Sequence, residues 1–416
     1  MQTHFCIRGI SGRGVFTLLG LVAALGCCIF MPDPMQAQAY KVLYNFTGEA
    51  DGGFPTAGLI RDAAGNLYGV TEGGGNLSCV INFTGCGVVF KLSGSKETVL
   101  YTFQGGTDGA DPQAGLIRDS QGNLYGTTAR GGDPNCVWGQ PYGCGTIFKL
   151  DPTGKETVLY RFKGGDDGAA PAATLLMDEA GNLWGTTQYE GYAGSQCFGP
   201  GCGTVFKLDP SGKLTSHLFR GSPTDGSWPL AGLVAGPAGD LYGTTLFGGP
   251  NDSGTIFKVD PTGKVKGLHN FDILTGDGAN PTGLLLSAGK LYGPTTSGGA
   301  FGGGSVYEIS PAGESVLYSF AQLNDSATPS PQGVLARDTG GNLYGTTAFS
   351  FPTIGYGTVY ELQPSGNLIT LHIFLGPNGD GSTPMSGVIR DSAGKLYGTT
   401  QQGGTIGGGT IFEITP

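Results

Sequence analysis

The sequence is poor in histidine and in charged residues. It has four histidines, and charged residues make up 13% of its 416 residues. Three of the histidines, His217, His269 and His372, take the place of a tyrosine in separate copies of the repeat described below. Because they belong to different copies, we expect no histidine cluster. This disfavours nucleophile, general-base and metal sites built on histidine.

Basic residues are also few. The chain has 22 lysines and arginines against 32 aspartates and glutamates, a formal net charge of −10. Binding to nucleic acid requires a basic surface that displaces the counterions of the phosphates, and an anionic membrane likewise attracts basic segments. The composition therefore argues against nucleic acid and against an anionic membrane surface as partners.

Common enzyme motifs are missing, whereas glycine and proline are abundant. The glycine-rich stretches 340–345 and 407–412 lack the lysine or the following helix of a phosphate-binding loop. The chain has neither a G-x-S-x-G nucleophile motif nor an apolar period typical of helices. Its 80 glycines and 25 prolines recur at regular positions beside Leu, Tyr and Phe. This indicates ordered β structure with many tight turns rather than disorder.

The N-terminus has the features of a secretory signal peptide. Arg8 and Arg13 precede the apolar stretch 15–30, and "AQA" at 37–39 provides the small residues of a signal-peptidase site. We expect a signal peptide over 1–39 and a mature single domain over 40–416, secreted to the periplasm or the cell exterior. Lipid anchoring through Cys27 is the alternative. No later segment is apolar enough to predict a transmembrane helix.

A unit of 50 to 59 residues is repeated seven times. Its aromatic "GNLYG" position falls at Tyr68, Tyr125, Trp184, Tyr242, Tyr292, Tyr344 and Tyr397. In the second copy the four apolar runs are 114–119, 123–128, 145–150 and 157–162. Each run is short, rich in β-branched and aromatic residues, and bounded by turn residues, which predicts a strand. The pattern predicts an all-β fold, a seven-bladed β-propeller of four-stranded antiparallel blades.

The turns and the two chain ends fit this architecture. "RDSQGN" and "DPTGK" have the Asp, Asn and Gly residues of tight turns between the first and second and between the third and fourth strands. The first copy is preceded by a fourth-type strand at 41–46, and the last copy stops after its third strand. We therefore predict that 41–46 pairs with 409–414 and closes the ring, which removes the open sheet edge.

The repeat also resembles a known family. The unit P-x-A-G-L-I-R-D-x-x-G-N-L-Y-G-T-T, followed by G-T-V-F-K-L, is similar to the GloVer tandem repeat of secreted bacterial proteins, named for gloeobacterial and verrucomicrobial examples. The resemblance spans the mature chain and departs at 283–289, which is one residue short and lacks the Arg-Asp pair. It implies a secreted propeller-like repeat protein, and it implies no activity and no catalytic residue.

Six cysteines of the mature chain form three local pairs. Each pair brackets the connection between the second and third strands of one of the first three units: Cys79 and Cys86, Cys136 and Cys144, Cys197 and Cys202. Even numbers of cysteines in a secreted chain favour disulfides. Metal binding is the alternative, which the lack of a C-x-x-C motif and of nearby histidines disfavours.

The longer connections, after the second and fourth strands, should share one face near the central channel. Aspartates recur there in a "DG" turn, with an added carboxylate at Asp111, and the candidates are Asp51, Asp108, Asp111, Asp167, Asp225, Asp277 and Asp380. A carboxylate ring could bind Ca²⁺ or a hydroxyl-rich ligand, although Asp-Gly is first of all a turn dipeptide. No confident metal site or other cofactor is predicted.

Aromatic residues in the same connections point toward carbohydrate. Trp138, Tyr142 and Trp228 lie outside the predicted strands, and aromatic rings with nearby polar groups suit sugar faces. Loop packing is the plainer interpretation of these rings.

Three functional hypotheses follow from the sequence. The first is a monomeric extracellular protein that binds a polysaccharide, another extracellular polymer or a protein partner. The second is a propeller enzyme of lactonase, lyase or glycosidase type that uses carboxylates at the channel mouth. The third is a structural surface protein. The uniform inner strands favour binding or scaffolding over catalysis, but the fold cannot choose among the three.

Overall fold

The fold was analysed in a computed structural model. It describes residues 39–416 apart from 80–83, 137–142, 192–193, 195–196, 198, 322–328, 350–354 and 377–378. The segment Gln38–Pro416 forms one compact unit. The expected signal peptide and Cys27 lie outside the described residues. Within those that are described, no helix has the length and apolarity needed to span a membrane.

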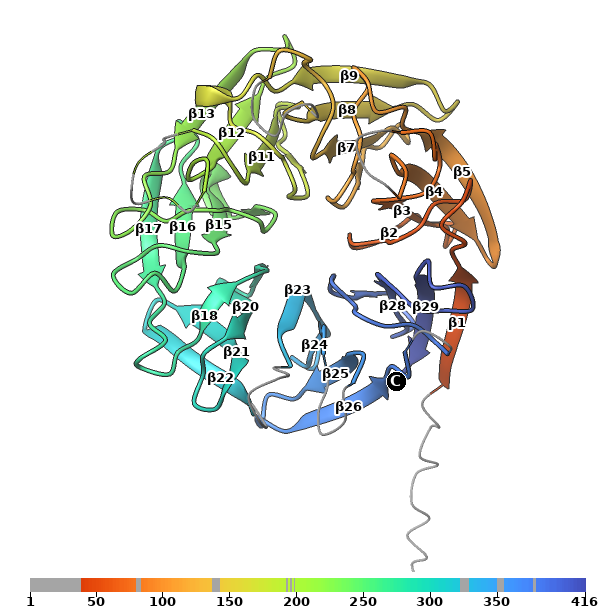
Figure 1. The fold of residues 1–416 in the computed structure, drawn as a ribbon. Coiled ribbons are helices and arrows are strands. Elements are labelled where there is room, and N and C mark those ends of the chain that lie inside the picture. The colour runs from red at the N-terminus through yellow and green to blue at the C-terminus, as the bar shows by residue number, and fades with distance from the viewer. Residues whose placement is uncertain are drawn as a thin grey trace, which may run out of the picture. The chain divides into compact units, whose positions relative to one another are not determined.

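Seven antiparallel sheets follow one another around a ring (Figure 1). Blade 1 consists of β2 (Ile60–Arg61), β3 (Leu67–Thr71), β4 (Val88–Ser93) and β5 (Lys96–Thr102). Blade 2 consists of β6 (Ile117–Arg118), β7 (Leu124–Thr128), β8 (Thr146–Leu150) and β9 (Glu156–Arg161). Blade 3 consists of β10 (Leu176–Met177), β11 (Leu183–Thr187), β12 (Thr204–Leu208) and β13 (Leu214–Leu218). In each blade the first strand is innermost and the fourth is outermost.

The remaining blades repeat this order. Blade 4 consists of β14 (Val234–Ala235), β15 (Leu241–Thr245), β16 (Thr255–Val259) and β17 (Val265–Asn270). Blade 5 consists of β18 (Ala279–Pro281), β19 (Leu285–Ser287), β20 (Lys290–Ser297), β21 (Gly302–Ser310) and β22 (Gly313–Ala321). Blade 6 consists of β23 (Pro331–Arg337), β24 (Leu343–Thr347), β25 (Thr358–Leu362) and β26 (Leu368–Ile373). Two short 3-10 turns, η1 (Gly165–Asp167) and η2 (Pro237–Gly239), lie in connections. The predicted all-β, seven-bladed propeller is confirmed.

Blade 7 joins the two ends of the described chain. Its strands are β27 (Ile389–Arg390), β28 (Leu396–Thr400), β29 (Thr410–Thr415) and β1 (Ala39–Asn45). β1 pairs antiparallel with β29, with Val42 opposite Phe412 and Asn45 opposite Thr410. The predicted closure between 41–46 and 409–414 is therefore confirmed, and both long edges of β29 are paired.

The repeated turn residues act as the sequence predicts. Asp119 accepts hydrogen bonds from the backbone and side-chain nitrogens of Asn123, at 2.8 and 2.7 Å, and from Tyr125 Oη at 3.1 Å. Gly122, with a φ of +90°, supplies the left-handed residue that this turn requires. The conserved spacing of Asp, Gly, Asn and Tyr within the repeat therefore reflects one hydrogen-bonded turn.

Aromatic rings hold neighbouring blades together. A phenylalanine at the end of each outermost strand, or directly after it, packs edge to face on the aromatic residue of the next blade's third strand, as Phe103 does on Phe148, with ring centroids 5.2 Å apart. Equivalent pairs occur at all seven blade junctions of the described chain, from Phe46 with Phe90 to Phe374 with Phe412. The edge-to-face arrangement is favoured by the quadrupoles of the rings, and these pairs form part of the core between the blades.

The two threonines of "GTT" have separate roles in this core. Thr127 Oγ1 donates a hydrogen bond to the carbonyl of Pro171 in the next blade at 2.9 Å. Thr128 Oγ1 lies 2.8 Å from Thr146 Oγ1 in the third strand of its own blade. Both hydroxyls are buried and satisfied. The first threonine therefore links blades, and the second links strands.

The innermost strands are shorter than the sequence suggests. Five of them, β2, β6, β10, β14 and β27, contain two paired residues where a run of about six is apolar. The inner segments converge on the centre and crowd one another, because a Cβ on Gly115 of blade 2 would lie 2.7 Å from Thr174 Oγ1 of blade 3. Contact with the neighbouring blade thus replaces pairing within the blade. In the other two blades, β18 and β19 have three residues each and β23 has seven.

Candidate functional site

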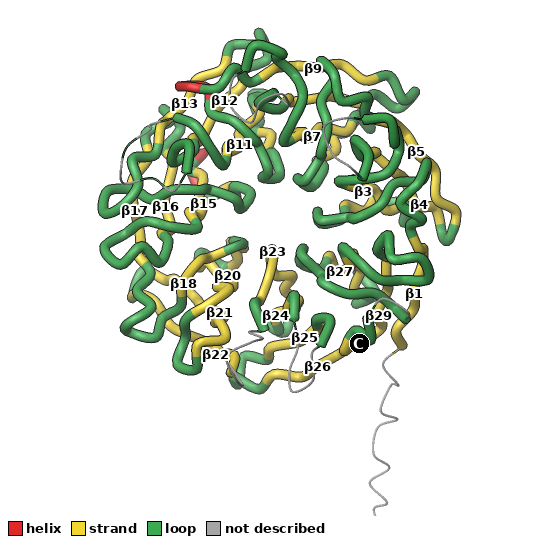
Figure 2. Tube along the Cα trace, viewed as in Figure 1, coloured by secondary structure: helices red, strands yellow, loops and turns green. Residues whose placement is uncertain are grey.

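The three predicted disulfides are present. The Cα atoms are 5.6 Å apart in Cys79–Cys86, 5.8 Å in Cys136–Cys144 and 4.9 Å in Cys197–Cys202. Each closes the connection between the second and third strands of blades 1, 2 and 3. The backbone of these connections contacts the "DG" connection of the same blade, as in the hydrogen bond from Gly132 N to Gly106 O at 3.0 Å. The two kinds of long connection therefore meet, and Figure 2 shows loops over most of the face turned to the viewer.

Six of the candidate aspartates lie against the outermost strands. Each carboxylate lies within hydrogen-bonding or ion-pair distance of the tyrosine or histidine of the preceding outer strand: Asp51 with Tyr44, Asp108 with Tyr101, Asp167 with Tyr160, Asp225 with His217, Asp277 with His269 and Asp380 with His372. Five of them also accept backbone N–H groups of the same connection, as Asp108 does from Gln104. The structure does not bring the six together, because each closes a different blade junction.

A second set of equivalent positions lies directly before the inner segments. In every blade the residue before the proline of the inner segment has a positive φ, between 48° and 60°, although it is not glycine: Phe54, Asp111, Ala170, Trp228, Asn280, Ser330 and Thr383. Such a conformation is strained for side chains with a Cβ. The side-chain types differ at every position although the backbone repeats. We call these seven residues the rim positions.

The disulfides support three consecutive rim positions. Asp111 N donates to Cys86 O at 3.1 Å, Ala170 N to Cys144 O at 3.0 Å and Trp228 N to Cys202 O at 2.9 Å. In each case the acceptor is the second cysteine of the disulfide in the preceding blade. The cross-linked connections of blades 1–3 therefore hold the rim of blades 2–4.

A central cavity of about 790 Å³ lies within the ring. It is lined by inner segments of all seven blades, including Thr56, Gln113, Thr174, Leu230 and Thr282. Two residues that follow the "GTT" position, Glu72 and Gln401, also line it. Of the candidate aspartates, none is among the residues that line this cavity in the described part of the chain. The cavity has the size of a small-molecule or sugar site.

Charged groups gather at the junction of blades 1 and 2. Asp111, with 2% of its surface exposed, forms an ion pair with Arg130, whose Nε lies 3.4 Å from Asp111 Oδ2. Gln113 Nε2 donates to Asp111 Oδ1 at 3.2 Å. Burial raises the pKa of Glu72 to about 7, the Asp111 carboxylate adds to the increase, and Arg130 opposes it. Burial likewise raises the pKa of Asp111, against Arg130 and Gln113. Glu72 can therefore hold or release a proton near neutral pH.

Aromatic rings gather at the junction of blades 3 and 4. Trp228 packs edge to face on Tyr189, with ring centroids 5.2 Å apart, and on Phe247, with centroids 5.3 Å apart. All three side chains are half-buried. Leu230, two residues after Trp228, lines the cavity. Of the aromatic candidates, Trp228 is thus on the rim, whereas Trp138 and Tyr142 lie outside the described residues.

Two residues of this site were not predicted from the sequence. Glu72 and Arg130 follow the "GTT" of their repeats by one and two positions, where the other copies have Ala, Gln, Leu, Thr, Gly, Tyr, Phe or Ser. Alignment of the seven copies on "GTT" shows that both positions vary. The variation is the signal that could have identified them, since the surrounding residues repeat.

The fold and site define a β-propeller whose repeating framework carries a non-repeating rim around a central cavity. A family model, the Gloeobacter/Verrucomicrobia repeat, matches residues 20–136, 84–288 and 277–416. The chain therefore belongs to this repeat family, as its "GNLYGTT" motif suggests. No curated protein matches the chain.

Solved structures with similar folds are distant in sequence. The extracellular domain of a protein described as a hybrid two-component system from B. thetaiotaomicron is 14% identical, with a TM-score of 0.55 over 90% of this chain and 39% of that one. A protein described as a 6-phosphogluconolactonase from Bacteroides uniformis is 17% identical, with a TM-score of 0.47 over 75% and 84%. A luciferin-regenerating enzyme is 14% identical, with a TM-score of 0.44 over 91% and 95%. At these identities the likeness concerns the fold alone.

Proposed function

We propose that the protein is secreted through the signal peptide at 1–39 and binds a polysaccharide or another extracellular polymer on its rim. The observation that carries this proposal is the rim itself, where seven equivalent, strained backbone positions hold seven different side chains, each two residues before a residue that lines the cavity. A scaffold protein has no need for such variation at one level of an otherwise repeating ring. Strained backbone and variable connections on a rigid framework are typical of binding sites.

The chemistry of the rim suits a hydroxyl-rich ligand. The Tyr189–Trp228–Phe247 group offers apolar ring surface for sugar faces. Gln113 and Arg130 can orient hydroxyls, and the buried Asp111 carboxylate positions both of them. Both groups lie where the disulfides hold the rim. Disulfides are also consistent with an oxidising compartment outside the cytoplasm.

The test is a melting-temperature screen of the protein against soluble polysaccharides, followed by calorimetry of any that raises the melt. Trp228→Ala and Asp111→Ala place alanine where blade 3 already has Ala170 with a φ of 53°, so the backbone tolerates both changes. Thr153→Ala, in an exposed turn between the third and fourth strands of blade 2, is the control. We expect affinity to fall tenfold or more in the first two variants and to be unchanged in the control. A ligand bound equally by all three variants would place its site elsewhere.

A second candidate function is supported by the proton affinity of Glu72. A carboxyl with a pKa of about 7 beside the Asp111–Arg130 pair has the properties of a general acid or base. A propeller enzyme of lactonase, lyase or glycosidase type could use it at the channel mouth. Sugar lactones and oligosaccharides should then be turned over by the wild type but at least a hundredfold more slowly by Glu72→Gln. Equal rates in the two proteins would show that Glu72 is not the general acid or base.

A further inference from the structure

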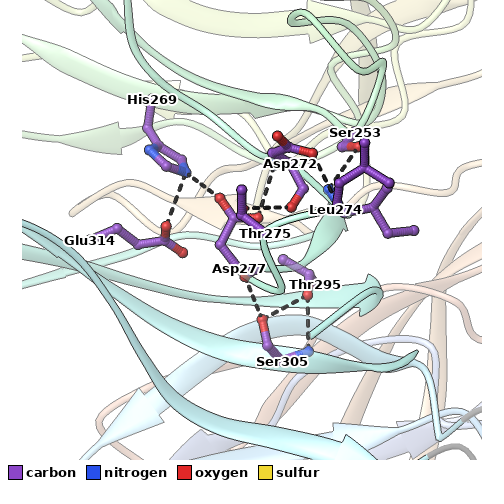
Figure 3. A network of polar contacts seen from close by, with 10 residues as sticks. Ser253, His269, Asp272, Leu274, Thr275, Asp277, Thr295, Ser305 and Glu314 are labelled. Carbon is purple, nitrogen blue, oxygen red and sulfur yellow. Dashed lines mark hydrogen bonds and ion pairs between the residues drawn. The ribbon is translucent and has the colours of Figure 1, made fainter. Parts of the chain in front are cut away.

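His269, Asp277 and Glu314 form a compact cluster at the junction of blades 4 and 5. His269 lies on β17, Asp277 in the connection that follows, and Glu314 on β22. His269 Nε2 is 3.4 Å from Asp277 Oδ2 and 3.4 Å from Glu314 Oε2. One ligand atom from each residue lies within 4.8 Å of the other two. Figure 3 shows the three side chains pointing toward one another from separate elements.

The cluster contains buried polar atoms that lack hydrogen bonds. His269 Nε2 and Glu314 Oε1 are buried, and among the described residues neither has a hydrogen-bond partner. Leaving such atoms unpaired is costly. The other carboxylate is held in place, because Asp277 Oδ1 accepts the backbone N–H of Asp272 at 2.8 Å, which leaves Oδ2 toward the histidine. The His269 ring is fixed by edge-to-face packing on Phe271, with centroids 4.7 Å apart.

Four equivalent junctions each lack one member of this set. At two junctions a tyrosine replaces the histidine beside Asp and Glu: Tyr44, Asp51 and Glu97, and Tyr101, Asp108 and Glu156. At two others the His–Asp pair is kept but the glutamate is replaced. Val265 takes its place in the strand register beside His217 and Asp225, and Tyr40 takes it beside His372 and Asp380. A tyrosine at this position forms an ordinary hydrogen bond with the aspartate. A histidine there provides an imidazole nitrogen that can bind a metal ion. Within the described residues, the three ligand types meet at this junction alone.

The geometry and charge fit a divalent metal ion. Ligand atoms bound tetrahedrally at about 2.0–2.2 Å lie about 3.3–3.6 Å from one another, which the two distances of 3.4 Å match. Two carboxylates and a neutral imidazole balance a double positive charge. One nitrogen with two oxygens favours Zn²⁺ or a similar transition metal, because Ca²⁺ requires six to eight oxygens. The side chains retain 14–20% of their surface exposed, so the cluster lies close to the protein surface.

We propose that His269 Nε2, Asp277 Oδ2 and Glu314 Oε2 bind one Zn²⁺ ion, with water completing the coordination. The ion joins the outermost strands of blades 4 and 5 and therefore stabilises that junction of the ring. None of these residues lines the described cavity, so the site is distinct from the rim and does not depend on its proposed function.

Metal binding by the full-length protein tests the proposal directly. After removal of metals with EDTA, the protein is titrated with Zn²⁺ by calorimetry and with Co²⁺ by visible absorption, and its melting temperature is measured with and without Zn²⁺. We expect one ion per chain, a Co²⁺ spectrum of low coordination number, and a higher melting temperature with Zn²⁺ but not with Ca²⁺.

Variants drawn from the other blades provide matched controls. His269→Tyr reproduces the combination of blades 7 and 1, so it should fold normally, with the metal-free melting temperature of the wild type, but lose the ion. Glu314→Val reproduces the residue at Val265 and should weaken binding at least tenfold. His217→Tyr, at the junction that lacks the glutamate, should bind as the wild type does. Absence of binding in the wild type, or equal binding by His269→Tyr, would overturn the assignment. The close approach of the three side chains would then be explained by a proton that they share.

Discussion

Phe46 packs edge to face against Phe90, with ring centroids 5.1 Å apart. Phe46 follows the strand that completes blade 7, whereas Phe90 lies in blade 1. This pair therefore joins blade 7 to blade 1. Blade 7 is the blade that contains strands from both ends of the described chain. The stability of the closure depends on this contact together with the pairing of β1 and β29.

Phe46→Ala should lower the free energy of unfolding by about 3–5 kcal/mol, because the phenyl ring is fully buried and its removal leaves a cavity. Urea unfolding followed by tryptophan fluorescence measures the change. Leu77→Ala, at a side chain that is 58% exposed, is the control and should change stability little. A loss of less than 1 kcal/mol in Phe46→Ala would show that the closure does not depend on this ring.

Thr128→Val should lower the free energy of unfolding by about 1–3 kcal/mol, although valine has nearly the same shape. The Thr128 hydroxyl contacts Thr146 Oγ1, accepts the Thr146 backbone N–H and donates to the Arg130 carbonyl. Its removal leaves buried partners unsatisfied. Thr153→Val, in an exposed turn, is the matched substitution. Equal stability of Thr128→Val and the wild type would refute the importance of this network.

Stability should fall as the pH rises toward and through 7. Burial raises the pKa of Glu97 and of Glu156 to about 7, with Asp51 and Asp108 adding to the increase, from a usual value of 4.5. The folded protein therefore binds these protons more tightly than the unfolded chain does between pH 4.5 and 7. Its stability is highest below the unfolded pKa and decreases across that window.

The double variant Glu97→Gln/Glu156→Gln removes both titrations, since glutamine resembles the neutral carboxyl. Its melting temperature should therefore vary less between pH 5 and pH 8 than that of the wild type. Glu179→Gln, at an exposed turn, controls for the change in net charge. Identical pH profiles for the wild type and the double variant would contradict the prediction.

Loss of a disulfide should affect the rim of the following blade. Replacing Cys79 and Cys86 by serine should cost about 2–3 kcal/mol, mainly because the unfolded chain gains freedom. Since Cys86 O accepts the Asp111 N–H, amide exchange at 108–112 should also accelerate. The segment 380–384 holds Thr383 without a disulfide and serves as the internal reference. An unchanged exchange rate at the Asp111 amide would show that the disulfide does not stabilise the rim.

Much of the fold could be predicted because it depends on short-range features that the repeat makes visible. The strand order, the turn chemistry at Asp119, the pairing of 41–46 with 409–414, and the local disulfides all follow from spacing along one chain. The same repeat did not show where the inner strands end. Crowding between Gly115 and Thr174 comes from separate blades and appears only when the ring is assembled.

The candidate site was predicted less completely. Asp111 and Trp228 occupy rim positions, and their part in ligand binding stays a prediction. The other aspartates close the connections against outer strands, and Glu72 and Arg130 were not among the predicted residues. Likewise, the placement of the histidines in separate repeats predicts no cluster of histidines. It does not exclude a single histidine meeting carboxylates from the same and the next blade, as His269 does.

The sequence by itself determined the period, the number of blades and the closure of the ring, because each repeat specifies its own strands and turns through local hydrogen bonds and apolar patterning. Only the tertiary structure decided which side chains meet. The electrostatic interaction of Glu72 with Asp111 and the contact of His269 with Glu314 join neighbouring blades. Their geometry depends on how one blade is rotated against the next. Packing between the blades determines this rotation, and it cannot be inferred from the sequence of a single repeat.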